Sequence, residues 1–169
     1  MPWFRLNVAH EPRLDPLEAW EFLNDVANLE RMTPPKMKFK FLGDSDKPLS
    51  LGSILVYSIR PLPFFKTLWV SEISAFEPPQ RFCDTQLKGP YSSWIHEHRI
   101  VKNTENKGCT IVDEIYFELP FGILGTLLFH LYVKKELLKA FTYRKRQLDV
   151  LIQNETHLNY QLTLKPLNA

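Results

Sequence analysis

The chain has 169 residues, of which 44% are hydrophobic and 24% are charged, and this length and composition indicate one globular domain with a hydrophobic core. The formal net charge of +2 lacks the basic excess typical of nucleic-acid-binding proteins, so no nucleic-acid partner is expected. The two cysteines, Cys83 and Cys109, exclude a disulfide framework and have no Cys-x-x-Cys spacing for a zinc or redox site.

The N-terminal part of the chain predicts a strand, two short helices and a second strand. Residues 3–9 alternate in hydrophobicity, as a strand does. The segment DPLE at residues 15–18 opens a helix, with Asp as the N-cap, Pro at the first helical position and Glu three residues after the cap. Asn24 or Asp25 caps a second short helix. Residues 36–41 alternate strictly between lysine and apolar side chains, which predicts a half-buried strand.

The middle of the chain reads as antiparallel strands joined by short turns. We expect strands over residues 53–60, 67–76, 81–88, 91–101 and 109–119. The loop from Pro61 to Phe65 is apolar, which is unusual because loops are normally hydrated. It either tucks under the sheet or rims the mouth of a cavity.

A single long helix is predicted from Phe121 to Ile152. Its apolar residues recur at helical spacing: Leu124, Leu127, Leu128, Leu131, Leu138, Phe141, Leu148, Leu151 and Ile152. At about 1.5 Å per residue the helix is on the order of 45 Å long. No second long helix is predicted to cover its apolar face, so the sheet must cover it.

These elements predict an α+β fold in which a curved antiparallel sheet of about seven strands wraps around one long C-terminal helix, with two short helices after the first strand. Residues 1–153 form a single domain in this interpretation. The tail, residues 154–169, shows no strong pattern, and we expect part of it to be disordered. The concave space beneath the sheet must be filled by side chains or by a ligand, and the aromatic content of 13% suits either.

One predicted strand carries two histidines on the same face. Side chains alternate along a strand, so Trp94, His96, His98 and Ile100 share a face, while Glu97 belongs to the opposite face, which suits solvent. The histidine face is therefore expected to be the inner one. The two imidazoles can hydrogen-bond within a core, contact a ligand, act as acid or base, or hold a metal if a third ligand comes from elsewhere.

Carboxylates on the flanking strands can reach these imidazoles. Asp84 and Gln86 alternate with Phe82 on the preceding strand. On the following strand Asp113 interrupts an apolar face, and a buried charge needs a partner, for which His98 or Arg144 is suitable. This pairing depends on the strand register, because a slip of one residue reverses every face.

No nucleophile motif, glycine-rich phosphate loop or metal-ligand spacing stands out. No catalytic residue, cofactor or metal is therefore predicted. On the helix, Tyr143 and Arg144 are candidate polar tips near a cavity. The basic residues of the helix's second half favour a solvated face, with contact to an anionic membrane surface as the alternative.

Four segments resemble the SRPBCC superfamily of START-like, helix-grip proteins. They are WVSEI at 69–73, PPQRFCDTQLKGPYSSWIHEHRI at 78–100, TIVDEIYFELPFGILG at 110–125 and LLKAFTYRKRQLDVLI at 137–152. The pattern resembles a ligand-binding bacterial branch labelled polyketide cyclase/dehydrase-like, and it extends to the N-terminal FLNDVANLERMTPP. The chain departs from it at Phe117, where the pattern prefers tyrosine, so any role for a hydroxyl there is lost.

The resemblance implies a deep pocket between the sheet and the long helix. We expect ligand contacts from Trp69, Asp84, Gln86, Trp94, His96, His98, Asp113, Phe117, Tyr143 and Arg144. The leading hypothesis is a carrier or sensor for a small apolar ligand that is lipid-, quinone- or polyketide-like. The alternatives are a cyclase or dehydratase that uses histidine as acid or base, and a module for protein or membrane-surface contact.

The chain is expected to be cytoplasmic. Its first residues lack the basic and apolar regions of a signal peptide. The most apolar run, Leu119 to Val133, is about 15 residues long and is interrupted by His130, which is too short to span a bilayer. Peripheral membrane contact is compatible with the sequence, and the sequence sets no oligomeric state.

Overall fold

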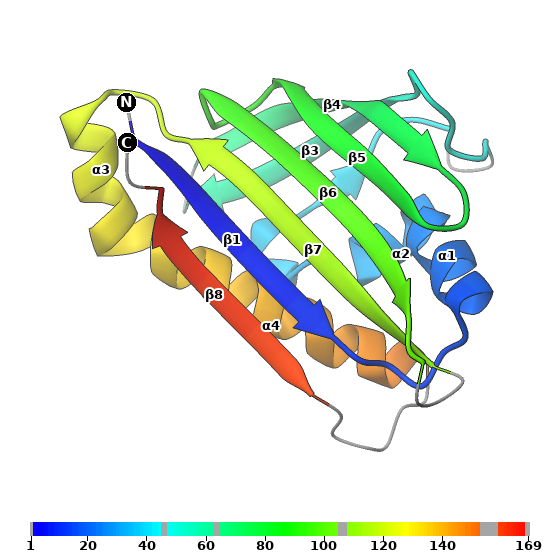
Figure 1. Cartoon of the computed structure of the whole chain (residues 1–169). Coiled ribbons are helices and arrows are strands. Elements are labelled where there is room, and N and C mark those ends of the chain that lie inside the picture. Colours follow the sequence, from blue (N-terminus) through cyan, green and yellow to red (C-terminus); the bar gives the residue numbers. More distant parts are fainter. Residues whose placement is uncertain (1, 45–46, 63–64, 105–107, 153–158, 168–169) are drawn as a thin grey trace.

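In a computed structural model, which describes residues 2–44, 47–62, 65–104, 108–152 and 159–167, one curved antiparallel sheet wraps around a long helix (Figure 1). The strand order is β2-β3-β4-β5-β6-β7-β1-β8. The strands are β1 (Trp3–His10), β2 (Lys40–Phe41), β3 (Ile54–Leu62), β4 (Phe65–Glu77), β5 (Arg81–Lys88), β6 (Ser93–Lys102), β7 (Cys109–Glu118) and β8 (Tyr160–Pro166). The predicted α+β helix-grip architecture is confirmed, with eight described strands instead of about seven.

Two short helices follow β1, as the sequence predicts. Helix α1 (Pro16–Asn24) begins with a capping box: the Asp15 carboxylate accepts hydrogen bonds from the backbone N–H groups of Leu17 and Glu18 at 2.8 and 3.0 Å. Helix α2 (Val26–Arg31) begins at Asp25, whose side chain accepts from the N–H of Ala27 at 2.9 Å. These caps fix where the chain turns away from β1 and back over the sheet.

The prediction of a strand over residues 36–41 is largely wrong. The two prolines before it favour a turn, and Pro35–Met37 forms the short 3-10 helix η1. Lys38 then takes a left-handed conformation with φ of 43°, which breaks any continuous strand. Of residues 36–41, only Lys40 and Phe41, which form β2, pair with β3. The alternation of exposure survives, because the lysines are exposed and Met37, Phe39 and Phe41 are half-buried.

The long helix has three consecutive segments, and its first apolar stripe is not buried. They are α3 (Ile123–Leu128), the π-helical η2 (Phe129–Val133) and α4 (Lys134–Leu151). The exposed fractions of Leu124, Leu127, Leu128 and Leu131 are 70%, 56%, 39% and 71%, so the expectation that the sheet covers them is wrong. Segment α3 lies at the end of the sheet where β1 begins, and there Phe129 is fully buried, unlike these leucines (Figure 1).

The C-terminal tail forms the eighth strand. Strand β8 pairs antiparallel with β1, with Leu6 opposite Leu164, so the expectation of a tail without regular structure is wrong for residues 160–166. Residues 154–158 and 168–169 of the tail lie outside the described residues. The strand covers the hydrogen-bonding edge of β1, which would otherwise be open to another chain.

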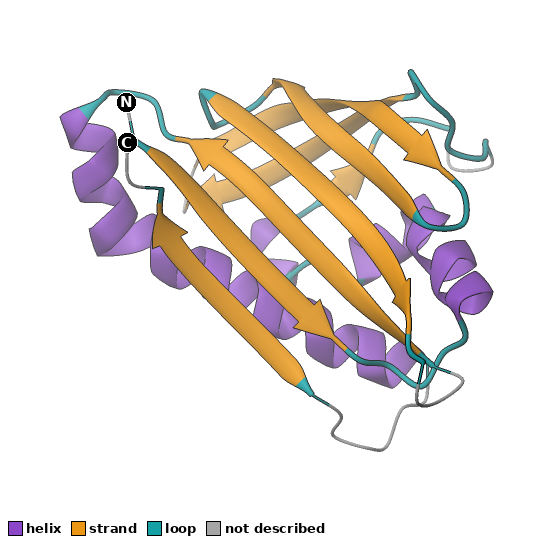
Figure 2. Ribbon diagram, in the orientation of Figure 1, coloured by secondary structure: helices purple, strands orange, loops and turns teal. Residues whose placement is uncertain are grey.

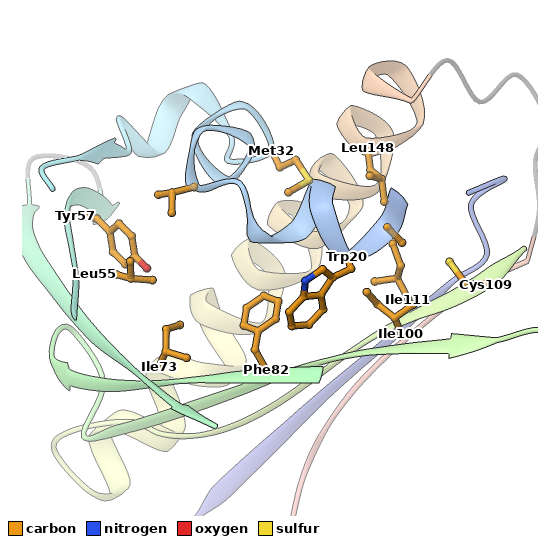
Figure 3. Packing of buried hydrophobic residues seen from close by; sticks show 12 residues of the cluster. Trp20, Met32, Leu55, Tyr57, Ile73, Phe82, Ile100, Cys109, Ile111 and Leu148 are labelled. Atoms are coloured by element: carbon orange, nitrogen blue, oxygen red, sulfur yellow. The ribbon is translucent and has the colours of Figure 1, made fainter. Parts of the chain in front are cut away.

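The core lies between the sheet and the helices. Figure 2 shows the helices gathered on the concave side of the sheet. Trp20 of α1 packs against Phe76 and Phe82, with ring centroids 5.3 and 5.9 Å apart, and Met32 and Leu148 belong to the same cluster (Figure 3). A second cluster surrounds Phe4, Trp94, Phe117 and Phe129 at the other end. Within the described part of the chain, no helix is both long enough and apolar enough to cross a lipid bilayer.

Candidate functional site

A chamber of about 180 Å³ lies between the two core clusters, under the sheet and against α4. Its wall is mostly apolar and comes from the short helices, from β3 to β6 and from α4. The wall residues include Leu23, Val26, Met32, Leu55, Tyr57, Ile59, Trp69, Ile73, Phe82, Trp94, Leu137 and Phe141. Its acidic and basic side chains are Asp84, His96, His98 and Arg144. Apolar walls with a few convergent polar groups are typical of sites for small molecules.

A larger groove of about 930 Å³ adjoins the chamber. It runs between η1, the end of β3, the turn before α3, and the start of α4. The groove and the chamber share five lining residues: Met37, Pro61, Tyr91, Leu137 and Ala140. One predicted alternative was that the apolar segment at 61–65 rims the mouth of a cavity. Pro61, Leu62 and Phe65 line the groove, which agrees with it. Residues 63–64 lie outside the described residues.

The sheet register brings the polar residues together at one end of the chamber. Asp84 on β5 lies opposite His96 on β6, and His98 on β6 lies opposite Asp113 on β7. All four side chains point to the concave face, since β6 alternates between buried and more exposed positions from Trp94 to Ile100. The face predicted as inner from the sequence is therefore the inner face.

The two imidazole rings lie against each other at an interplanar angle of 37°, between two carboxylates. Their centroids are 3.8 Å apart. His96 Nε2 lies 3.1 Å from Asp113 Oδ1 in a hydrogen bond, and His98 Nδ1 lies 2.7 Å from the same oxygen. On the other side, Asp84 Oδ2 lies 3.5 Å from His96 Nδ1 and 3.5 Å from His98 Nε2. Arg144 approaches Asp113 to 3.8 Å, so both partners predicted for Asp113 are present.

Burial and charge separate the protonation of the two histidines. Burial and the neighbouring His98 lower the pKa of His96 to about 4, so this imidazole is neutral near pH 7. Burial also opposes protonation of His98, but Asp113 and Asp84 outweigh it and raise the pKa of His98 above its ordinary value. Burial acts to raise the pKa of Asp113 too, yet Arg144 and the imidazoles hold it well below its ordinary value. The imidazoles likewise lower the pKa of Asp84 against the effect of burial, so both carboxylates favour the ionised form.

Six of the ten predicted ligand-contact residues line the chamber: Trp69, Asp84, Trp94, His96, His98 and Arg144. Asp113 lies behind the histidines and touches them, as described above. The Gln86 amide donates instead to the backbone carbonyl of Tyr91 at 2.8 Å. Phe117 is 0% exposed within the second core cluster, and Tyr143 lines a groove on the outer side of the helix. The last three are therefore outside the chamber wall.

Most of the apolar wall was not predicted as part of the site, and neither were Tyr57, Tyr91 and Ser71. Tyr57 lines the chamber, and its signal was present in the alternation of Leu55, Tyr57 and Ile59 on β3. Tyr91 lines both the chamber and the groove. It lies before the first residue of β6, so the alternation of side chains along that strand does not predict which way it points. Ser71 is fully buried and accepts a hydrogen bond from Trp69 Nε1 at 3.1 Å.

Comparison of the sequence with protein-family models and with curated proteins finds no match. The fold, in contrast, is found in solved structures. A START superfamily protein from Mycobacterium smegmatis aligns with a TM-score of 0.65 and 11% identity, over 90% of this chain and 99% of that one. The fold is the START-like helix-grip fold.

Two further structures share the helix-grip fold. Ginseng major latex-like protein 151 from Panax ginseng aligns with a TM-score of 0.62 and 12% identity, over 89% of this chain and 98% of that one. A protein from Thermus thermophilus aligns with a TM-score of 0.64 and 14% identity, over 90% and 99% of the two chains. The resemblance to the SRPBCC superfamily is confirmed at the level of the fold, and these low identities carry no ligand or activity to this chain.

Proposed function

We propose that this helix-grip domain binds one small, mainly apolar molecule in the chamber, as a carrier or sensor of a lipid-, quinone- or polyketide-like compound. The observation that supports this most directly is the chamber itself, whose wall is mostly aromatic and aliphatic and has Asp84, His96, His98 and Arg144 together at one end. An apolar cavity of about 150 Å³ can hold a benzene ring, so about 180 Å³ suits one ring or a short branched chain.

A longer ligand would extend into the groove. The shared residues form a passage whose sides are apolar, and Ala140 is its smallest member. The ring or chain of the ligand would lie in the chamber, its polar group against the histidine cluster, and any tail along the groove. The groove volume of about 930 Å³ is in the range of sites for drug-sized molecules.

Substitution of Ala140 by Phe tests this arrangement, because a benzyl group at that position fills the passage. We would titrate the protein with 1-anilinonaphthalene-8-sulfonate, which has apolar rings and one anionic group, and follow its fluorescence. We expect saturable binding to the wild type and at least about tenfold weaker binding to A140F. The matched control is A27F, since Ala27 is an exposed alanine on α2, outside the chamber. Equal affinity of all three proteins would contradict the proposal.

An enzyme is the second candidate, because the adjacent His96 and His98 with their carboxylates resemble an acid–base pair positioned at the end of a ligand chamber. A polyketide cyclase or dehydratase would use these groups to move protons on a bound substrate. Replacement of both histidines by Gln separates the candidates. Carriage requires that the double variant binds more weakly but still binds, whereas an enzyme requires that conversion of a bound polyketide substrate stops.

Contact with an anionic lipid surface is a further part of the proposal, since exposed apolar side chains of α3 lie beside the groove. Phe121, which lines the groove, is 79% exposed, and Ile123, Leu124 and Leu127 follow at 90%, 70% and 56%. Lys36, Lys38 and Arg60 line the same groove. Co-sedimentation with vesicles containing phosphatidylserine should fall strongly in L124E/L127E and persist in L17E, a control at an exposed leucine of α1. A cytoplasmic location stays a prediction of the sequence.

A further inference from the structure

Three potential metal ligands meet at the polar end of the chamber. They are the carboxylate of Asp84 on β5 and the imidazoles of His96 and His98 on β6, and their ligand atoms all lie within 4.8 Å of one another. The register of β5 and β6 places Asp84 directly opposite His96. The histidine side chains are 7% and 6% exposed, so the strands and α4 already exclude most water from the group.

The spacing fits a shared metal ion better than direct hydrogen bonds. Asp84 Oδ2 lies 3.5 Å from one nitrogen of each imidazole, whereas N–H···O hydrogen bonds are typically about 2.7–3.2 Å long. Zn–N and Zn–O bonds are about 2.0–2.2 Å, so two ligand atoms at a tetrahedral angle are about 3.4 Å apart. The two Asp84–imidazole distances therefore match the ligand spacing around a tetrahedral ion, and all three ligand atoms lie within 4.8 Å of one another.

Asp113 holds the imidazoles from behind. Its Oδ1 lies 3.1 Å from His96 Nε2 and 2.7 Å from His98 Nδ1, which are the nitrogens that face away from Asp84. A metal-bound histidine commonly donates its second N–H to a carboxylate, which fixes the tautomer and leaves the other nitrogen free for the metal. Here Asp113 is placed to do this for His96, while His98 Nδ1 lies 2.7 Å from the same oxygen without hydrogen-bond geometry, and Arg144 at 3.8 Å offsets the charge of Asp113.

We propose that Asp84, His96 and His98 bind one divalent first-row transition-metal ion of the Zn²⁺ or Fe²⁺ type. Two imidazoles and one carboxylate suit such ions and leave coordination positions open. Those positions face the chamber, which Trp94 and Phe141 also line. A carbonyl, hydroxyl or carboxylate group of a bound molecule can occupy them.

The sequence alone predicts no metal site because two histidines two residues apart supply only two ligands. The third ligand comes from the neighbouring strand, and only the register identifies it. The site also stands apart from the proposed carriage of an apolar molecule, because a metal titration requires no organic ligand. The dye titration and the metal titration can therefore fail independently.

The test is calorimetric titration of the full chain, purified without a polyhistidine tag and stripped with a chelator, with Zn²⁺ alone. We expect one ion per chain and at least about 100-fold weaker binding in D84N, H96Q and H98Q. D113N should weaken binding by about 10- to 100-fold, since Asp113 positions the ligands without touching the metal. H130Q is the matched control, because His130 is exposed on the long helix, and its affinity should equal that of the wild type.

A Co²⁺ titration of the wild type supplies a readout that does not depend on the variants' folding. Intense visible absorption indicates a four- or five-coordinate ion with nitrogen and oxygen ligands. Circular dichroism would confirm that each variant is folded before its affinity is compared. A wild type that binds Zn²⁺ no more tightly than the H96Q/H98Q double variant would overturn the proposal.

Discussion

At the scale of single residues, Asp113 is a buried carboxylate whose charge needs partners, because it is only 6% exposed. Two imidazoles and the Arg144 guanidinium surround it within 3.8 Å. A buried ion pair contributes little compared with apolar packing, but removal of one member leaves the others charged and unpaired. The contribution of Asp113 to stability should therefore appear when it alone is changed.

Substitution of Asp113 by Asn should lower the free energy of unfolding by about 3 kcal/mol, because Arg144 and His98 lose their buried counterion. Urea unfolding at neutral pH measures the change. The control is D44N, at a carboxylate that is 54% exposed and pairs with Lys47 on the surface, where a change of less than about 0.5 kcal/mol is expected. An equal effect of the two substitutions would contradict the account of Asp113.

The sequence predicted the inward direction of Asp113, but it did not predict where the side chain of Gln86 ends. Asp113 could be found because it interrupts an apolar alternation, and alternation gives direction without any knowledge of the partner strand. Gln86 alternates in the same way, yet its amide turns to the backbone of Tyr91 instead of the chamber. Strand alternation assigns a face, but it does not say where a long, flexible side chain ends.

At the scale of elements, the long helix shows what periodicity leaves undetermined. Apolar spacing predicted the helix and its length, and α4 does bury Leu137, Phe141 and Leu148. The same spacing in α3 produces an exposed stripe, because the described strands do not cover that segment, and the next residue to enter the core is Phe129. Periodicity identifies an apolar face, and the extent of the sheet decides whether it is covered.

The exposed leucines of α3 and the buried Phe129 predict that substitutions within one helix differ strongly in their effect on stability. Phe129 is fully buried, and its ring stacks on Phe4 with centroids 3.8 Å apart, so F129A should lower the free energy of unfolding by about 3–5 kcal/mol. Leu124 is 70% exposed, so L124A should change it by less than about 0.5 kcal/mol. Denaturant unfolding of both variants measures the difference. A large loss in L124A would mean that the leucine stripe is buried after all.

Strand β8 gives the second prediction at this scale. Leu164 is 9% exposed and lies opposite Leu6 of β1, so L164A should destabilise the fold by about 2–3 kcal/mol. Leu87 on β5 is 57% exposed, and L87A serves as the matched control with little expected effect. Thermal unfolding followed by circular dichroism compares them. Equal thermal stability of L164A and L87A would contradict a stabilising role for β8.

The tail was missed because its strand has only a weak hydrophobic pattern. In β8 only Leu164 is buried, and the other residues are half-buried or exposed, as is common for a strand at the edge of a sheet. What makes this segment a strand is the free edge of β1, which lies at the other end of the chain. A local pattern carries no information about such a distant partner.

At the scale of the whole molecule, the two cysteines report on opening of the sheet. Cys109 is 0% exposed, and burial raises its pKa to about 11, while burial also raises the pKa of Cys83. A raised pKa keeps the thiol protonated, and only the thiolate reacts. At about pH 8 the thiolate fraction of Cys109 is on the order of one in a thousand.

We therefore expect both thiols to react with Ellman's reagent far more slowly in the native protein than in urea. Raising the pH towards 11 should accelerate the reaction of Cys109, since the folded thiol then loses its proton. Labelling at about pH 8, with and without urea, is read by absorbance. Native labelling as fast as in urea would show that the sheet around β7 opens freely, which is incompatible with a closed chamber beneath it.

The central claim is that a chamber between the sheet and α4 holds one apolar molecule, and native mass spectrometry tests it most directly. Wild type and A140F would be purified side by side, incubated with a lipid extract of the expression host, and analysed, with solvent extraction of anything retained. We predict one bound molecule per wild-type chain and little or none on A140F, because Ala140 lines the passage. The absence of an adduct on either protein, or equal occupancy of both, would contradict the claim.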